Sequence, residues 1–352
     1  MDSSLQPLPL SPDDERAIRA ARETGVFCVL SRTAVVEVRG ADAGRYLEAM
    51  CTKDLSGLDP GGLRYAALLD DLAHYVADFW IWRVGESWWL ETESALARPL
   101  AERLTRFAVA DDATADVLES KHLFHLEGPG AWTAATQILG SGMSADAVGS
   151  GAPGTSVTAW ARRSRFGQEG VSLVAESPAP VRWIEATRAA GLVPASFAAQ
   201  ECLRIEAGRV RGGVDMTAKH LLPEIGLWGA VSLDKGCFPG QEIVRRVISR
   251  GEVKRRLVGF VESPNPEAQT VTGTLFPPTS IARSARMGGR VGLGYANAGD
   301  AVGSWSLIAD MDRKDSNPDL FLAQVAALPF VSGPHAAAPD VPGERVENSA
   351  SR

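Results

Sequence analysis

A single cysteine stands in a stretch of sequence that could make it reactive. Cys237 lies in the octapeptide Lys-Gly-Cys-Phe-Pro-Gly-Gln-Glu, residues 235–242, just before a segment with helical spacing. The free amides of a helix N-terminus and the cation of Lys235 would favour the thiolate, the nucleophilic and metal-binding form of cysteine. The alternative is a small apolar side chain packed under a turn, the commonest role of a free cysteine. Local chemistry leaves both interpretations open.

Carboxylates elsewhere in the chain could also take part in chemistry. Asp70 and Asp71 close a predicted strand, so their side chains point to opposite faces and only one can face a given site. Such a carboxylate could stabilise positive charge on a substrate amine, or it could belong to an ordinary turn. Glu206 lies near the end of a predicted helix over 198–208, where it could accept from paired donors or be a solvated acid.

The octapeptide resembles the signature Lys-Gly-Cys-aromatic-x-Gly-Gln-Glu of the YgfZ family. These are folate-binding proteins of iron–sulfur cluster assembly and maintenance, related to the aminomethyltransferases (T-proteins) of glycine cleavage. Residues 69–72, Leu-Asp-Asp-Leu, resemble the aminomethyltransferase segment whose aspartate lies near folate N10 and is the key catalytic acid. Residues 203–208 resemble the segment whose glutamate holds the pterin. Aminomethyltransferases as a rule lack a cysteine at the position of Cys237, so the resemblance favours YgfZ.

The resemblance implies a tetrahydrofolate site in a central cavity, with Glu206 on the pterin and Cys237 near the rim as a redox-active or cluster-contacting thiol. Its partners would be folate and iron–sulfur client or assembly proteins, with a link to tRNA modification. The other residues implied to contact folate are those of the motif and the following helix: Lys235, Gly236, Gly240, Gln241, Glu242, Arg245 and Arg246.

The helix after Cys237 is predicted from Pro239 and Gly240 as entry residues and from the apolar spacing over 241–249. Glu242 and Arg246 are four residues apart, in the favourable order for a helical ion pair. The basic run could bind the glutamate tail of a folate, an acidic partner or RNA phosphates, or its arginines could pair with neighbouring acids. It comprises Arg245, Arg246, Arg250, Lys254, Arg255 and Arg256.

Composition limits the class of protein. The 352 residues are 45% hydrophobic and 22% charged, ordinary for a globular protein of two or three domains. A formal net charge of -7 argues against a protein that mainly wraps nucleic acid. Residues 1–12 lack a secretory pattern, and no apolar run is long enough to span a bilayer. We therefore expect a cytoplasmic monomer with no membrane partner and no direct nucleic-acid binding.

The thiols and imidazoles of the chain do not suggest a metal site. The four cysteines form no Cys-x-x-Cys pair, and the five histidines do not supply ligands at metal spacing. We predict reduced thiols and no bound metal.

The order of predicted elements indicates an α+β fold with a ferredoxin-like element, from a β-α-β-β-α-β alternation that includes hairpins at 76–93 and 157–176. Four tryptophans in the first hairpin could stack a flat ligand, although packing on a sheet face is the favoured interpretation: Trp80, Trp82, Trp88 and Trp89. After residue 256, short strands at 257–262, 271–275, 290–295 and 320–328 predict a small β-barrel or sandwich.

We accordingly predict a flexible tail at 1–11, a folate-binding α+β region at 12–253, a C-terminal β-barrel at 254–332 and a disordered tail at 333–352. The resemblance implies a GcvT-like three-part fold around a central folate cavity.

Three functional hypotheses follow. The leading one is a tetrahydrofolate-binding accessory protein for iron–sulfur enzymes. The second is a folate-dependent aminomethyltransferase or demethylase that uses Asp70 or Asp71 and makes Cys237 structural. The third is an interaction module whose basic loop docks a partner and whose pocket is vestigial. Whether the protein is an enzyme stays open among them.

Overall fold

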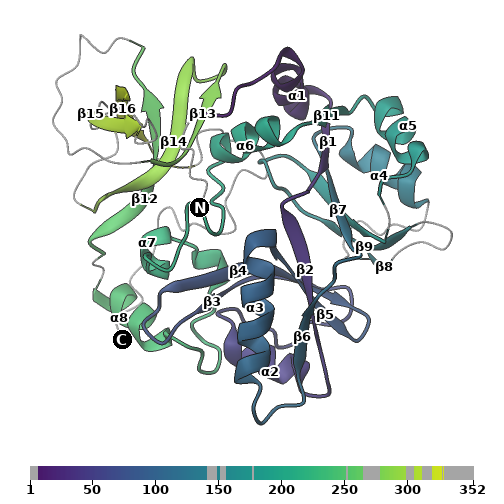
Figure 1. Cartoon of the computed structure of the whole chain (residues 1–352), viewed down its shortest axis with the longest axis vertical. Helices are drawn as coiled ribbons and strands as arrows, with labels where there is room; N and C mark the ends of the chain where they lie inside the picture. The colour runs from purple at the N-terminus through teal and green to yellow at the C-terminus, as the bar shows by residue number, and fades with distance from the viewer. Residues whose placement is uncertain are drawn as a thin grey trace, which may run out of the picture.

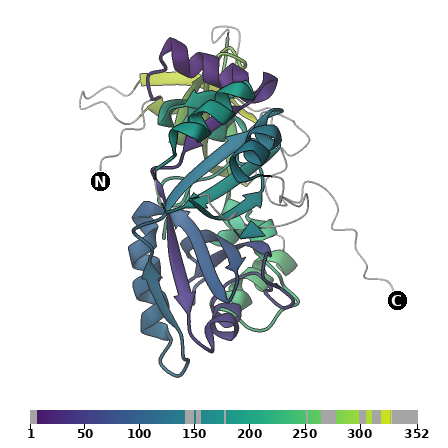
Figure 2. The same cartoon turned by 90° about the vertical axis from the view of Figure 1, so that its right-hand side faces the viewer.

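The fold consists of three β-sheets with helices packed on them (Figures 1 and 2). The computed structural model describes residues 7–140, 149–150, 156–176, 178–250, 253–264, 278–298, 305–310, 319–326 and 328. The α+β character predicted from the sequence is confirmed.

One antiparallel sheet, at the bottom of Figure 1, has the strand order β3-β4-β5-β2-β6. Its strands are β2 (Thr33–Arg39), β3 (Leu63–Leu69), β4 (Tyr75–Val84), β5 (Ser87–Glu93) and β6 (Thr114–Val117). Helices α2 (Ala43–Met50) and α3 (Ser94–Phe107) bury their apolar stripes against one face of this sheet. On its other face, Trp82 and Trp89 join a core shared with the second sheet, and Asp78, Trp80 and Glu91 line a cavity.

A second sheet has the order β11-β1-β7-β10-β9-β8 and is antiparallel except where β1 pairs with β11. Its strands are β1 (Val26–Val29), β7 (His122–Glu127), β8 (Gly149–Ser150), β9 (Val157–Arg162), β10 (Gly170–Ala175) and β11 (Val193–Ala195). Helices α4 (Ala131–Leu139) and α5 (Val181–Ala189) contribute to one core, and α1 (Pro12–Glu23) and α6 (Phe197–Glu206) to another.

The third sheet is antiparallel, with the order β13-β14-β12-β16-β15. Its strands are β12 (Arg255–Glu262), β13 (Pro278–Ser284), β14 (Gly289–Asn297), β15 (Trp305–Asp310) and β16 (Asp319–Ala326). Within the described residues these strands form an open sheet, and no pairing closes them into the predicted barrel. Three short elements precede this sheet: α7 (Leu222–Ile225), the 3₁₀ helix η1 (Trp228–Ala230) and α8 (Gln241–Arg250).

Local signals in the sequence placed many of these elements correctly. Ser11 caps α1, and its hydroxyl accepts from the Asp14 amide while the Asp14 carboxylate accepts from the Ser11 amide. The hairpin predicted at 76–93 and the helix predicted after Cys237 are confirmed.

Other sequence predictions are not settled by the fold. The strand predicted at 271–275 and the tail at 333–352 lie outside the described residues. The ferredoxin-like element and the division near residue 253 stay predictions. None of the helices in the described part of the chain has the length and apolar character needed to cross a membrane.

Candidate functional site

A cavity of about 530 Å³ opens on the free face of the first sheet. Its walls come from β3, β4 and β5, from the loop after β9, from the segment after α6 and from strand β12. Segments from about residue 33 to residue 328 therefore meet around one space. The volume falls in the range, about 300–1,000 Å³, of small-molecule sites in proteins.

Strand alternation explains why polar side chains line this cavity. Successive residues of a strand point to opposite faces. In β4, Phe79 and Ile81 therefore enter the core beneath α2 and α3, whereas Asp78 and Trp80 face the cavity. The β4–β5 register places Trp80 opposite Glu91, which faces the cavity as well.

Asp78 is held by two tyrosines inside this cavity. Its carboxylate accepts a hydrogen bond from the Tyr65 hydroxyl at 2.7 Å and another from the Tyr75 hydroxyl at 2.5 Å. Burial raises the pKa of Asp78, and the two hydroxyls oppose that rise because they stabilise the ionised form. Trp80 lies beside Tyr65, with ring centroids 5.0 Å apart, so an aromatic wall adjoins the carboxylate.

Glu93 is a second cavity carboxylate on the next strand. Burial raises its pKa to about 7, with Asp78 adding to the rise and Arg211 opposing it. In the described part of the chain, no side chain or amide forms a hydrogen bond or ion pair with the Glu93 carboxylate. Since buried polar groups are normally partnered, this carboxylate is available to a ligand.

Arginines dominate the remaining walls. Arg163 and Arg165 both pair with Glu91, which also accepts from the Trp82 indole at 3.0 Å. Burial alone would raise the pKa of Glu91, but these two cations outweigh it and lower the pKa. The lining contains the three acids Asp78, Glu91 and Glu93 and six arginines, at least four of which already pair with carboxylates of the chain. The six are Arg163, Arg165, Arg204, Arg209, Arg211 and Arg256.

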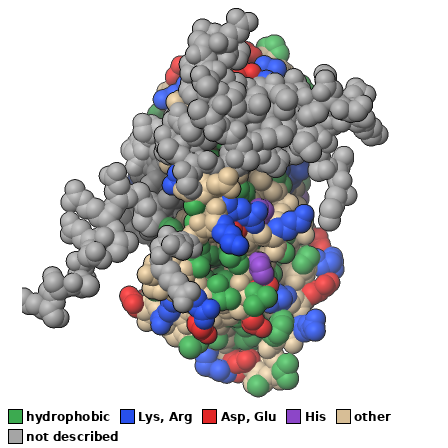
Figure 3. Space-filling model, turned by 90° about the vertical axis from the view of Figure 1, so that its left-hand side faces the viewer, with side chains coloured by type: hydrophobic (Ala, Val, Ile, Leu, Met, Phe, Trp, Pro, Cys, Tyr) green, Lys and Arg blue, Asp and Glu red, His purple; other side chains and the backbone are tan. Residues whose placement is uncertain are grey.

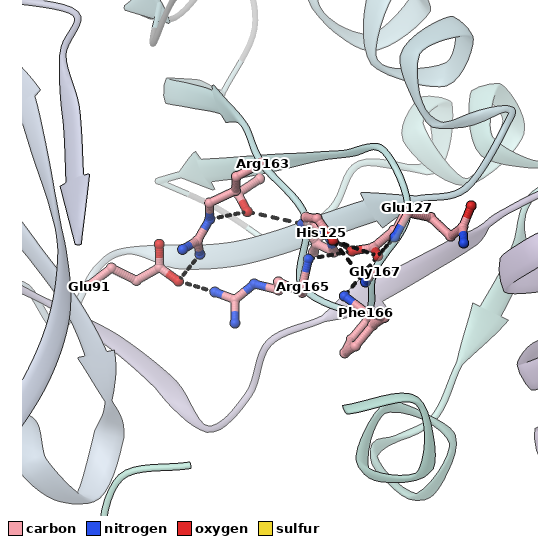
Figure 4. A network of polar contacts seen from close by, with 10 residues as sticks. Glu91, His125, Glu127, Arg163, Arg165, Phe166 and Gly167 are labelled. Atoms are coloured by element: carbon pink, nitrogen blue, oxygen red, sulfur yellow. Dashed lines mark hydrogen bonds and ion pairs between the residues drawn. The ribbon is translucent and has the colours of Figure 1, made fainter. Parts of the chain in front are cut away.

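Glu127 fixes the loop that carries two of these arginines (Figure 4). Its fully buried carboxylate accepts from the backbone amides of Arg165 at 2.6 Å, Phe166 at 2.7 Å and Gln168 at 2.8 Å. The His125 ring donates to the same carboxylate at 2.7 Å. A loop bound in this way offers its arginines to the cavity in a fixed position.

The network continues from Glu127 back to the cavity through His125 (Figure 4). The other ring nitrogen of His125 lies 3.0 Å from the Ser172 hydroxyl, which accepts from Arg163 Nε at 2.9 Å. This chain of contacts fits a neutral imidazole protonated at Nε2. Burial lowers the pKa of His125 from 6.5 to about 4, although Glu127 opposes that change.

We expect His125 to make the protein less stable in mild acid. Because its pKa is lower in the folded state, the unfolded chain binds more protons between pH 6.5 and 4, and stability is lost as the pH falls through that window. Its contribution to this loss is about 2 kcal/mol between pH 7 and 4.5. Urea unfolding at both pH values should show a smaller loss for His125→Gln than for wild type. An equal loss would contradict the assignment, and His122→Gln, at an exposed position of the same strand, is the control.

Cys237 is exposed and does not line the cavity, and its neighbours in the motif build the loop around it. The ammonium of Lys235 is buried, where it donates to the backbone oxygens of Glu48, Cys51 and Lys53 at the end of α2. The Glu48 carboxylate lies 3.2 Å from it. Lys235 therefore ties the motif to α2.

Gly240 lets the motif loop pack closely against the turn after β3. Its φ of +77° is a left-handed conformation, and a Cβ there would lie 2.7 Å from both the Asp70 oxygen and the Ala73 Cα. Gly236 faces open space, and the Gln241 side chain lies 3.5 Å from the Gly236 oxygen. Neither Gly236, Gly240 nor Gln241 lines the cavity.

Three charged residues of α8, Glu242, Arg245 and Arg246, make local contacts and do not line the cavity. Arg246 contacts Glu242 at 2.5 Å, four residues away as predicted, and Arg245 donates to the Leu233 carbonyl. Arg255 pairs with Glu224 at 3.1 Å. On the face shown in Figure 3, basic and acidic side chains stand side by side with exposed hydrophobic ones.

Asp70 and Asp71 lie in the turn between β3 and β4, outside the cavity lining. The Asp70 carboxylate accepts from the amides of Leu72 and His74 and contacts the His74 ring at 3.1 Å. Burial alone would raise the pKa of Asp70, but these hydrogen bonds outweigh it and lower the pKa. Asp70 therefore stabilises a turn, and Asp71 is exposed.

Glu206 is fully buried, but on the side of α6 that faces α1 and β13. It pairs with Arg22 and accepts from the Ser284 hydroxyl at 2.5 Å. The next two residues of the segment, Ala207 and Gly208, line the cavity, whereas Glu206 does not. Glu206, the residue predicted to hold the pterin, thus links α6 to α1 and β13.

The cavity residues Asp78, Glu91, Glu93, Arg163 and Arg165 were not singled out by the sequence analysis. One signal could have found the first three. They are acids in a hairpin otherwise rich in tryptophan, phenylalanine and isoleucine, and Glu91 and Glu93 stand at alternate positions. Acidic side chains are rarely buried unless they are paired. No local signal distinguishes the two arginines.

Fold and cavity together define an α+β protein with an internal site that holds carboxylates, arginines and aromatic rings. The glycine cleavage system aminomethyltransferase T of Bartonella henselae superimposes with a TM-score of 0.74 at 21% identity, over 92% of this chain and 91% of that one, which shows a shared fold. The GCVT N-terminal domain model matches residues 10–235, and the chain belongs to that family.

Named relatives agree with this membership. An aminomethyltransferase of Halalkalibacterium halodurans is 31% identical over 262 residues, which span 70% of this chain and 69% of the relative. One from Streptomyces coelicolor is 26% identical over 346 residues, 92% and 91% of the two chains. A putative chloroplastic transferase of Arabidopsis thaliana is 25% identical over 300 residues, 80% of this chain and 68% of the relative.

Proposed function

We propose that this protein binds tetrahydrofolate in the cavity and acts as an accessory protein for the assembly or maintenance of iron–sulfur enzymes. The observation that carries the folate assignment is the combination of carboxylates, aromatic rings and arginines in one lining. Carboxylates and aromatic rings stand on the β3–β5 wall, and the arginines come from the loop after β9, from α6 and the segment after it, and from β12. The family membership and the aminomethyltransferase relatives support the same ligand.

The residues present fit a reduced folate. The pterin offers adjacent N–H donors that a carboxylate such as Asp78 or Glu93 can accept. Trp80 and Tyr65 can pack on its rings, and arginines such as Arg209 can bind the carboxylates of the glutamate tail. When bound, tetrahydrofolate supplies a carrier for one-carbon groups; the chain's own residues hold and orient it and exclude water.

The exposed thiol of Cys237 supports a separate accessory step. It stands outside the cavity lining and is accessible to an iron–sulfur client or assembly protein. In this proposal the folate and the thiol act at different places, the protein is a cytoplasmic monomer, and its clients include enzymes linked to tRNA modification. In this proposal the other motif residues do not contact folate. They hold the loop that presents Cys237.

A second candidate, a folate-dependent one-carbon transferase or demethylase, is favoured by Asp78. A carboxylate held by two tyrosines inside the cavity is placed to stabilise positive charge on a bound amine. In the sequence analysis this role fell to Asp70 or Asp71, which the structure places in a surface turn. Formation of methylene-tetrahydrofolate by wild type and its loss in Asp78→Asn would support this candidate over the accessory role.

Anaerobic calorimetry with tetrahydrofolate tests the proposed site. We expect wild type, Cys237→Ala and Asp71→Asn to bind equally, because neither substituted side chain lines the cavity. Asp78→Asn should bind about tenfold more weakly, as loss of a charge-assisted hydrogen bond implies. Absence of binding by all four proteins would refute the folate assignment. Weakening by Asp71→Asn but not by Asp78→Asn would place the site at the surface turn instead.

A further inference from the structure

Two acids face each other across adjacent strands in the cavity. Asp78 lies on β4 and Glu93 on β5, and the antiparallel register that pairs Trp80 with Glu91 places Asp78 opposite Glu93 when continued by two residues. The Thr92 hydroxyl donates to the Asp78 carbonyl at 2.8 Å, so the strands stay adjacent at this level. Directly opposed residues on one sheet face have Cβ atoms about 5 Å apart, within reach of each other's side chains.

Their surroundings do not neutralise both charges. Asp78 receives two tyrosine hydroxyls and no cation, and Glu93 has no bonded partner in the described part of the chain. The nearest cations are already engaged. Arg204 pairs with Glu201 and Asp215, and Arg211 with Glu201.

The other elements around Asp78 and Glu93 also carry charged side chains, and the structure gives their contacts. Arg165, on the loop after β9, is bound to Glu91. Arg209, after α6, acts on Tyr65. The ionisable groups around the two acids are thus Tyr65, Tyr75, Glu91, Arg163, Arg165, Arg204, Arg209, Arg211 and Arg256. Two close carboxylates without a dedicated cation do not ionise independently.

We propose that Asp78 and Glu93 share a proton in the free protein and that an N–H-rich ligand group displaces it on binding. The identity of the ligand, the pterin end of tetrahydrofolate, rests on the proposed function, whereas proton sharing in the free protein does not. A donor-rich ring edge favours ionised carboxylates, so the shared proton leaves to solvent as the ligand's N–H groups take its place. Glu93 is then the residue that couples ligand binding to pH, and an analogue without ring donors would not release the proton.

Proton sharing is tested first in the free protein. Carboxyl carbon NMR of Glu93 should show a titration midpoint near 7, as burial and Asp78 dictate. Asp78→Asn should move this midpoint down by about half a unit or more, because it removes the neighbouring negative charge. Asp71→Asn is the matched control and should leave it unchanged. A midpoint that Asp78→Asn does not move would overturn the proposal, whether or not folate binds.

Proton release is tested by calorimetry with tetrahydrofolate at pH 6 in buffers of different ionisation enthalpy. Wild type should release about one proton per ligand, and Glu93→Gln should release almost none from this pair. If the variant releases as many protons as wild type, proton displacement is wrong while the folate assignment stands. If wild type does not bind, the folate assignment and the ligand half of the proposal fall together, and the NMR titration alone decides proton sharing.

Discussion

Glu127→Gln is expected to lower the free energy of unfolding by about 3 kcal/mol, because it disrupts a buried, multiply bonded carboxylate. The carboxylate accepts from three backbone amides of the 165–168 loop and from the His125 ring. A glutamine of the same size would turn an amide group, itself a donor, toward some of these donors. The loop would then lose the contacts that fix Arg163 and Arg165 at the cavity.

Urea unfolding followed by tryptophan fluorescence measures this change. Glu169→Gln is the control, since Glu169 belongs to the same segment but is exposed. Its substitution should change stability by less than about 0.5 kcal/mol. Equal effects of the two substitutions would mean that Glu127 does not organise the loop. A stable Glu127→Gln variant that binds tetrahydrofolate as wild type does would lead to the same conclusion.

Elements marked by local chemistry could be predicted from the sequence. Ser11 and Pro12 define the start of α1, Gly85 the hairpin turn, and Pro239 and Gly240 the entry to α8. Each of these signals acts within a few residues and depends little on the rest of the fold. Strand pairing is different. Nothing local in β12–β16 specifies which strands become edges, and the pairing of the described strands does not confirm the predicted barrel.

The site was harder to predict because it depends on which side chains are buried and on which of them point into the cavity. Asp70 and Asp78 both follow apolar residues in the sequence, yet one stabilises a turn and the other faces the cavity. Glu206 and Arg204 are two residues apart on α6, and only Arg204 lines the cavity. These outcomes depend on contacts with residues far away in the chain, such as Ser284 for Glu206 and Ser280 for Arg204.

The motif loop and the cavity occupy different places, but the hairpin β3–β4 touches both. Gly240 packs on the turn 70–73, and the strand that follows begins at Tyr75, whose hydroxyl binds Asp78 in the cavity. Phe238 and Val244 share a small core with Leu69 and Ala73 at the same turn. The octapeptide therefore supports the strand that carries the cavity carboxylate, while Cys237 itself stays exposed to solvent.

Lys235→Met is expected to destabilise the protein by about 3 kcal/mol, since it leaves buried backbone oxygens without a donor. Three carbonyl groups at the end of α2 and the Glu48 carboxylate depend on this ammonium. Cys237→Ala, two residues away and exposed, should change stability by less than about 0.5 kcal/mol. Chemical denaturation of both variants separates the roles within the motif. If Lys235→Met were as stable as Cys237→Ala, the lysine would be free to act on the thiol, and the structural role assigned to it here would be lost.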